Sequence, residues 1–93
     1  MLSAGGITAL VLAAQRGGVP GALADRFGVS HKCLVPIGGR PLIEHVLETL
    51  SRAAVVRTII VSIEAPEVLA ANQMIAGLIH DGRLKVVRSM DNL

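Results

Sequence analysis

Aromatic side chains are almost absent from this chain of 93 residues, which contains one Phe, no Tyr and no Trp. We therefore do not expect nucleic acid to be bound by stacking of bases on aromatic side chains. Charged residues make up only 17% of the chain and hydrophobic residues 52%, a balance that excludes intrinsic disorder. The net charge of +2 comes from scattered Lys and Arg. No run of basic residues indicates a surface for nucleic acid or for a membrane.

Cysteine is also scarce, because Cys33 is the single one. An intramolecular disulfide is thereby excluded, and a reducing cytoplasmic location is expected. No apolar stretch approaches the roughly 18 residues of a membrane span. The apolar start of the chain lacks the charged segment of a secretory signal. A mean hydropathy of +0.61 instead indicates buried strands, together with apolar surface that meets further sequence or a partner chain.

Strands that alternate with amphipathic helices are what the sequence does contain. The expected strands are Ile7–Ala14, Arg57–Ile63 and Leu84–Val87, with a short extended piece at Cys33–Ile37. One helix is expected to begin at Pro41 as its first residue, with Leu42, Ile43, Val46, Leu47 and Leu50 as its apolar stripe. Another is expected from Pro66 to about Ile79, capped by Gly82, with Val68, Ala71, Ile75, Leu78 and Ile79 on its buried side. This order predicts an α/β fold with right-handed crossovers and a parallel sheet.

The loop after the first strand is the first place to look for a ligand site. Ligands of open parallel sheets bind beyond the carboxyl ends of the strands. The small residues Ala13 and Ala14 would let a ligand approach the main chain, and Gly17 and Gly18 can leave amides facing a phosphate. An ordinary flexible turn is the alternative interpretation. Lys32, which precedes an extended segment, is a point charge suited to a phosphate, against the alternative of a solvated surface lysine.

Two linked segments carry a resemblance to a known family. The sequence reads LVLAAQRGG at 10–18 and HKCLVPIGGRPLIEHVLETL at 31–50. Together they resemble the N-terminal part of the NTP-transferase (nucleotidyltransferase) superfamily, and in particular molybdenum-cofactor guanylyl- and cytidylyltransferase-like proteins. The resemblance implies a Rossmann-like, three-layer α/β/α nucleotidyltransferase (GT-A-like) fold, truncated to about three parallel strands and two helices. Residues 1–93 would then form the N-terminal, nucleotide-binding portion of such a domain.

The same resemblance implies a reaction and a set of site residues. A phosphorylated acceptor, molybdopterin-like or a sugar phosphate, would attack the α-phosphate of an NTP, with GTP or CTP favoured, and pyrophosphate would leave. Lys32 would act on the phosphates as the catalytic residue. The residues implied to contact the nucleotide are Leu12, Ala13, Ala14, Gln15, Arg16, Gly17, Gly18 and Lys32. Mg²⁺ is implied as the cofactor, but the aspartate that binds it in the family is not identifiable here.

Several positions depart from the family pattern. Gln15 replaces the first glycine of the loop, and Val19 stands where an arginine is expected, with Arg16 nearby. His31 replaces the proline before the lysine, and Glu64 stands about where relatives often have a nucleotide-contacting Asn. Asp91 is a late acid that we interpret as part of a frayed terminus rather than as a metal ligand. These departures indicate a divergent branch of the family.

Two other interpretations of the sequence propose a function of a different class. The chain is alternatively a non-catalytic module that forms a homodimer through its open sheet edge, a template for strand pairing. An NAD-binding module, with Glu64 as the ribose-binding acid, is disfavoured because the first turn lacks the glycine spacing. Cys33 next to Lys32 is interpreted as a small core residue, since no positioned histidine and third group make it a nucleophile.

Overall fold

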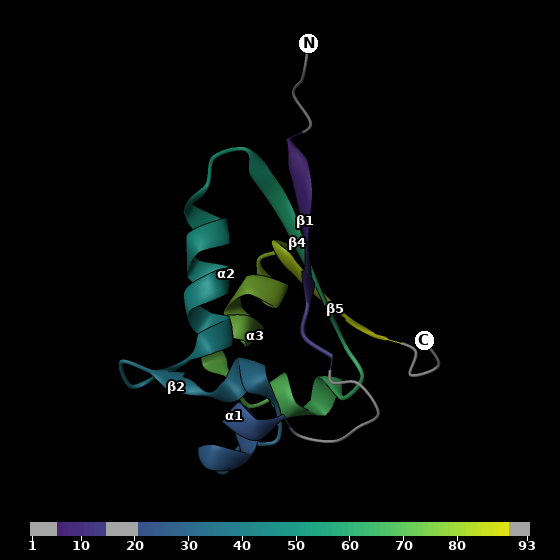
Figure 1. Ribbon diagram of the computed structural model, residues 1–93. Helices are drawn as coiled ribbons and strands as arrows, with labels where there is room; N and C mark the ends of the chain where they lie inside the picture. Colours follow the sequence, from purple (N-terminus) through teal and green to yellow (C-terminus); the bar gives the residue numbers. More distant parts are fainter. Residues whose placement is uncertain (1–5, 15–20, 90–93) are drawn as a thin grey trace.

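The computed structural model of the protein describes residues 6–14 and 21–89 as a three-stranded parallel sheet with two main helices (Figure 1). The strand order is β1-β4-β5, and a separate two-stranded hairpin joins β2 to β3. The elements are β1 (Ile7–Leu12), α1 (Ala22–Arg26), the 3₁₀ turn η2 (Lys32–Leu34), β2 (Pro36–Ile37), β3 (Arg40–Pro41), α2 (Leu42–Arg52), β4 (Val56–Ile63), the 3₁₀ turn η3 (Pro66–Leu69), α3 (Gln73–His80) and β5 (Leu84–Arg88).

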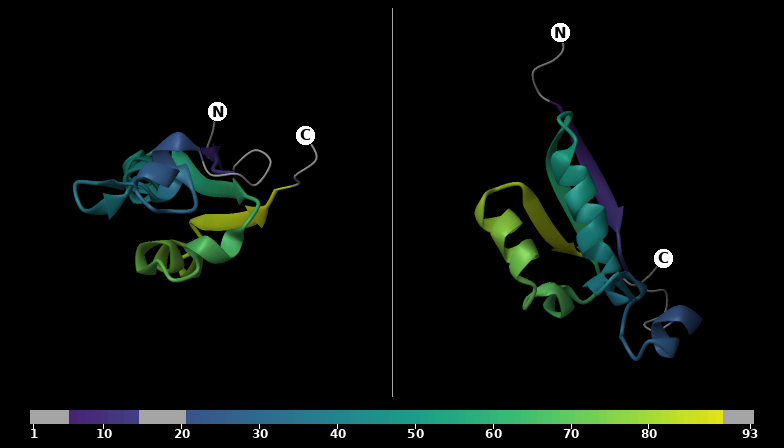
Figure 2. Two further views of the ribbon diagram at one scale, coloured as in Figure 1. Left: turned by 60° about the horizontal axis from the view of Figure 1, so that its bottom comes forward. Right: turned by 90° about the vertical axis from the view of Figure 1, so that its left-hand side faces the viewer.

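Both long helices cover the same face of the sheet (Figure 2). The chain moves from β1 through α2 to β4, and from β4 through α3 to β5, always stepping in the same direction across the sheet. Right-handed crossovers that advance in one direction place their helices on one face. The predicted α/β class, with about three parallel strands, is therefore confirmed. Within residues 6–14 and 21–89, no helix is long and apolar enough to cross a membrane.

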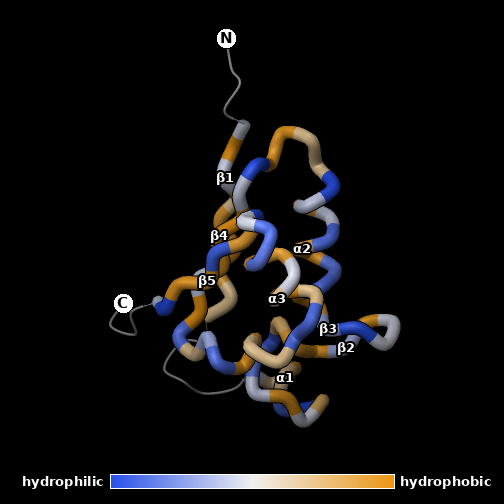
Figure 3. Tube along the Cα trace, turned by 180° about the vertical axis from the view of Figure 1, so that it is seen from behind, coloured by the Kyte–Doolittle hydropathy of each residue, from blue (hydrophilic) through white to orange (hydrophobic). Residues whose placement is uncertain are grey.

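The core lies between α2 and the central strand. Ile43 and Leu47 of α2 are almost fully buried, and Ile59, Val61 and Ile63 of β4 meet them from the sheet. Burial of each such side chain contributes about 1.5–3 kcal/mol to stability. The stripe predicted on this helix is confirmed, since its remaining members Leu42, Val46 and Leu50 are partly buried. In Figure 3 the trace of α2 alternates between hydrophobic and hydrophilic segments, as an amphipathic helix requires.

The first helix begins one residue later than the sequence predicted. Pro41 is the N-cap rather than the first helical residue, and its backbone is extended. The reason is the hairpin, in which Pro41 pairs with Pro36 and Arg40 pairs with Ile37. Ion pairs between Arg40 and the carboxylates of Glu44 and Glu48, both at 3.0 Å, hold the hairpin to α2.

The segment predicted to be extended at 33–37 is instead a tight turn followed by a two-residue strand. The backbone N–H of Leu34 donates to the carbonyl of His31 at 2.9 Å, and that of Val35 donates to the carbonyl of Lys32 at 3.1 Å. The turn places Cys33 in the core while Lys32 stays exposed.

The second predicted helix is interrupted at residues 70–72, which separate η3 from α3. Asn72 causes the break, because its side-chain oxygen accepts a hydrogen bond from the backbone N–H of Ile75 at 3.0 Å and so caps α3. Its side-chain amide donates to Glu44 at 2.6 Å, which ties the cap to α2.

That interruption also changes which side chains the second helix buries. Ile75 is buried and Val68 and Leu78 are partly buried, as predicted. Ala71 and Ile79 are exposed, contrary to the prediction, and Leu69 takes a core position instead. A single helical period cannot be continued across a break, so the predicted stripe is wrong at Ala71 and Ile79 and confirmed at Val68, Ile75 and Leu78.

Candidate functional site

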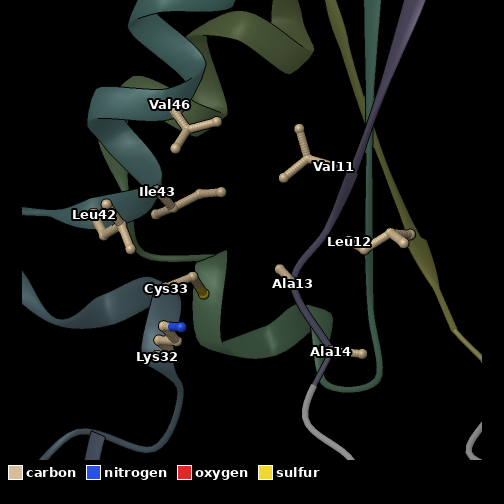
Figure 4. A pocket seen from close by; sticks show the side chains of 9 residues that line it. All are labelled: Val11, Leu12, Ala13, Ala14, Lys32, Cys33, Leu42, Ile43 and Val46. Atoms are coloured by element: carbon tan, nitrogen blue, oxygen red, sulfur yellow. The ribbon is translucent and has the colours of Figure 1, made fainter. Parts of the chain in front are cut away.

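A cavity of about 280 Å³ lies beyond the carboxyl end of β1, between that strand and α2 (Figure 4). It is where the topology of a parallel sheet places ligand sites. Its lining comes from three segments: the end of β1, the turn η2 and the first half of α2. The lining residues are Val11, Leu12, Ala13, Ala14, Lys32, Cys33, Leu42, Ile43 and Val46.

The β1 side of this cavity is formed by Val11 and by the small residues that follow the strand. Figure 4 shows the side chains of Val11 and Ala13 pointing toward α2, whereas the side chain of Leu12 points away from the cavity. The backbone N–H of Ala13 donates to the carbonyl of Ser62 at 2.9 Å, which continues the parallel pairing of β1 with β4. With only methyl side chains at Ala13 and Ala14, a ligand could approach the peptide groups closely.

Lys32 lies across the cavity from this backbone, on η2 (Figure 4). It is exposed, although its neighbours His31 and Cys33 are both buried. Within the part of the chain that the structure describes, its ammonium has no hydrogen-bond or ion-pair partner. The structure thus brings Leu12, Ala13, Ala14 and Lys32 to one cavity, and Lys32 is the one cationic residue in its described lining.

Cys33 shares the cavity wall but belongs to the hydrophobic core. Burial raises the pKa of the Cys33 thiol, a backbone hydrogen bond opposes this to a smaller degree, and the nearby charge of Glu64 raises it further. Nucleophilic cysteines require a lowered pKa. The thiol is therefore protonated at neutral pH and fills space as an apolar group.

The structure also joins two residues that sequence reasoning had treated separately. The imidazole Nε2 of His31 lies 2.7 Å from a carboxylate oxygen of Glu64, which directly follows β4. The other ring nitrogen, Nδ1, lies 2.9 Å from the hydroxyl of Ser30. In the sequence, His31 and Glu64 are 33 positions apart, so no local pattern could have paired them.

Four of the residues implied to bind nucleotide, Gln15, Arg16, Gly17 and Gly18, lie outside the described residues, as does Asp91. Their roles stay predictions. Sequence reasoning also missed the contribution of α2, whose Ile43 and Val46 close the cavity from the side. The helical stripe carried this signal, because its first turn had to face the end of β1.

A comparison with protein-family models matches residues 9–89 to the MobA-like NTP transferase domain. Neither the curated proteins nor the solved structures that were compared contain a match to this chain. The matched range begins within β1 and includes the cavity, Lys32 and the whole of β4 and β5. The fold, the position of the cavity and this match agree, and the chain therefore belongs to the family of MobA-like NTP transferase domains.

Proposed function

We propose that the chain binds a nucleoside triphosphate in the cavity between the end of β1 and Lys32. The observation that carries this proposal is that Lys32 and the main chain of Leu12, Ala13 and Ala14 line the same cavity. Exposed peptide groups can receive the base and sugar at close range. A lysine ammonium at the opening supplies a point charge for the phosphates.

The reaction that fits this arrangement is transfer of a nucleoside monophosphate to a phosphorylated acceptor. An acceptor phosphate oxygen forms a bond to the α-phosphorus, the bond between the α-phosphorus and its bridging oxygen breaks, and pyrophosphate leaves with that oxygen. Negative charge grows on the phosphate oxygens as this happens, so catalysis depends mainly on positioning and electrostatic stabilisation. Lys32 is the residue proposed to stabilise that charge. Its ammonium balances charge without entering a covalent bond.

Mg²⁺ is part of the proposal, because the family resemblance implies it. The residues in hand do not form its site: across residues 6–14 and 21–89, no group of three His, Cys, Asp or Glu side chains is placed to hold a metal ion. Glu64, the acid that follows β4, is engaged by His31. A magnesium ion in a phosphate-transfer site is usually bound by one or two carboxylates together with the substrate phosphates and several waters. We therefore assign the binding of nucleotide phosphates to this chain, and no metal ligand to residues 6–14 and 21–89.

The same resemblance favours GTP or CTP as the nucleotide, and a molybdopterin-like compound or a sugar phosphate as the acceptor. A cytoplasmic location agrees with a single free cysteine. We infer that the 93-residue chain supplies the nucleotide-binding loop and lysine, and that turnover requires groups it does not contain.

The experiment that tests nucleotide binding uses the only two lysines of the chain, Lys32 and Lys85. GTP, CTP and ATP, each with Mg²⁺, are titrated by calorimetry into the wild type, Lys32→Ala and Lys85→Ala. One charge-assisted hydrogen bond lost to Lys32→Ala should weaken binding about tenfold or more. Lys85→Ala removes the same charge from an exposed position on β5 and should leave affinity unchanged. No binding by wild type at millimolar nucleotide, or equal losses in both variants, would contradict the proposal.

A second candidate function is assembly with another copy of the chain, and a specific observation favours it. The face of the sheet that faces away from α2 and α3 exposes Leu10, Leu12 and Val87, with Leu10 62% and Leu12 75% exposed. Side chains alternate between the two faces along a strand, so Lys85 and Val87 lie on this face. Lys85 is the one charged side chain that the described residues of β5 place there. A nearly uncharged apolar face is complementary to itself, as a two-fold dimer requires. The two functions are compatible, because the cavity lies on the other side of β1.

A further inference from the structure

His31 is the only buried polar or charged residue among those that the structure describes, with 4% of its surface exposed. A buried imidazole requires partners for its ring nitrogens. Glu64 provides one at 2.7 Å, and because a carboxylate only accepts hydrogen bonds, Nε2 carries the proton in this contact. Ser30 provides the other at 2.9 Å. Both nitrogens are thus satisfied, and the orientation of the ring is fixed.

The position of Glu64 is itself fixed by the sheet. The carbonyl of Ser62 accepts the hydrogen bond from Ala13, and Glu64 follows Ser62 by two residues. The carbonyl of Glu64 accepts a hydrogen bond from the guanidinium of Arg88 at 2.8 Å, which connects it to the end of β5. Glu64 is therefore held in register with the β1 backbone that forms one wall of the cavity.

The other wall depends on His31. This residue caps η2, and its carbonyl accepts the first hydrogen bond of that turn, from Leu34. Lys32 is the next residue, and it is enclosed between two buried anchors, His31 and Cys33. Any displacement of the imidazole would move the start of the turn and, with it, the lysine.

We propose that Glu64 is a positioning residue, which holds Lys32 at the cavity by fixing His31. The contact joins the two walls of the cavity. The side chains of Glu64, which follows β4, and of His31, which precedes η2, therefore set the distance between the lysine and the β1 backbone. The role of Lys32 as a phosphate ligand rests on the proposed function, whereas the placement of the turn can be measured without any nucleotide.

The test compares Glu64→Ala with the conservative Glu64→Gln, whose amide oxygen can still accept from Nε2. Glu67→Ala is the matched control, because Glu67 is exposed, lies three residues away and contacts Arg88 only at 3.5 Å. Amide hydrogen exchange is followed at Leu34 and Val35, whose N–H groups close η2, and at Ile59 in the core. Nucleotide affinity is measured for each variant in the Lys32 and Lys32→Ala backgrounds, which forms a double-mutant cycle.

Glu64→Ala should speed exchange at Leu34 and Val35 and leave Ile59 protected. It should weaken nucleotide binding about tenfold when Lys32 is present and less than about twofold in the Lys32→Ala background, as expected for coupled residues. Glu64→Gln should restore most of the loss, and Glu67→Ala should change none of these quantities. A purely structural role would instead weaken binding equally in both backgrounds.

Equal losses in the two backgrounds, or exchange at Leu34 and Val35 that matches the Glu67→Ala control, would overturn the inference. If the wild type binds no nucleotide, the proposed function fails, and exchange at the two amides alone decides whether Glu64 positions the turn. If Glu64→Ala does not fold, as shown by loss of protection at Ile59, His31→Gln is measured in its place. It should also speed exchange at Leu34 and Val35 and weaken nucleotide binding only when Lys32 is present, and the outcomes that overturn the inference are unchanged.

Discussion

At the scale of single residues, neighbouring side chains around the cavity have opposite environments. Lys32 is exposed, whereas His31 and Cys33 on either side of it are buried. The 3₁₀ turn explains this, because side chains three residues apart coincide in such a turn and adjacent ones diverge by about a third of a revolution. A basic residue can therefore stand at the opening while its neighbours anchor it, and the lysine keeps its charge available for a ligand.

The raised pKa of Cys33 leads to a prediction about its reactivity. In the native chain, burial disfavours the thiolate, so a smaller fraction of the thiol is ionised at any given pH than in the unfolded chain. Alkylation by iodoacetamide, followed by mass spectrometry between pH 7 and 9, should be more than about tenfold slower in buffer than in denaturant. The ratio of the rate in denaturant to the rate in buffer should fall as the pH rises above the ordinary thiol pKa, because the thiol of the unfolded chain is then already ionised. Equal rates in the two conditions would show that Cys33 is accessible and ionised.

At the scale of elements, α3 shows how local signals end a helix. Gly82 has a φ of +77°, its N–H donates to the carbonyl of Ile79, and the N–H of Arg83 donates to that of Leu78. These two hydrogen bonds form a Schellman motif, which a glycine in the left-handed region completes. The guanidinium of Arg83 then donates to the carbonyls of Ser51, Arg57 and Val56, which fixes the start of β5 against the end of α2 and the start of β4.

Two glycines of this element should respond oppositely to the same substitution. Gly82→Ala places a Cβ in the left-handed region and should destabilise the protein by about 1–2 kcal/mol. Gly77→Ala lies inside α3, where an added Cβ would meet nothing within 4 Å, and should stabilise it by about 0.5–1 kcal/mol. Urea unfolding followed by circular dichroism measures both changes. The same sign of change for the two variants would contradict the assignment of Gly82 as the helix terminator.

At the scale of the whole molecule, the sheet has one covered and one uncovered face. The side chains of Ile59, Val61 and Leu84 meet α2 and α3, while Leu10 and Val87 stand on the opposite side, which no helix covers in the described parts of the chain. Exposed apolar surface of this kind marks an interaction site or an aggregation hazard. The apolar residues that raise the mean hydropathy of the sequence therefore lie on this uncovered face as well as in the core.

Self-association through this face is tested by Leu10→Lys. Leu10 is 62% exposed, so the substitution removes apolar surface without opening a cavity in the core. Sedimentation velocity of the wild type should show association that increases with protein concentration, and the variant should stay monomeric with an unchanged thermal midpoint. Thr49→Lys on the exposed side of α2 adds the same charge elsewhere and should not alter association. A wild type that stays monomeric at high concentration would exclude the dimer.

The sequence by itself determined the element order, the parallel sheet and the apolar stripe of α2, because these depend on local periodicity and on chain connectivity. It also directed attention to Lys32 and to the residues after β1, since ligands meet parallel sheets at that edge. Only the tertiary structure decided the break at Asn72, the turn at Lys32–Leu34 and the contact of His31 with Glu64. The contact of His31 with Glu64 joins residues 33 positions apart, and Asn72, which caps α3 locally, also donates to Glu44 of α2. No local pattern encodes which distant side chain will satisfy such a polar group.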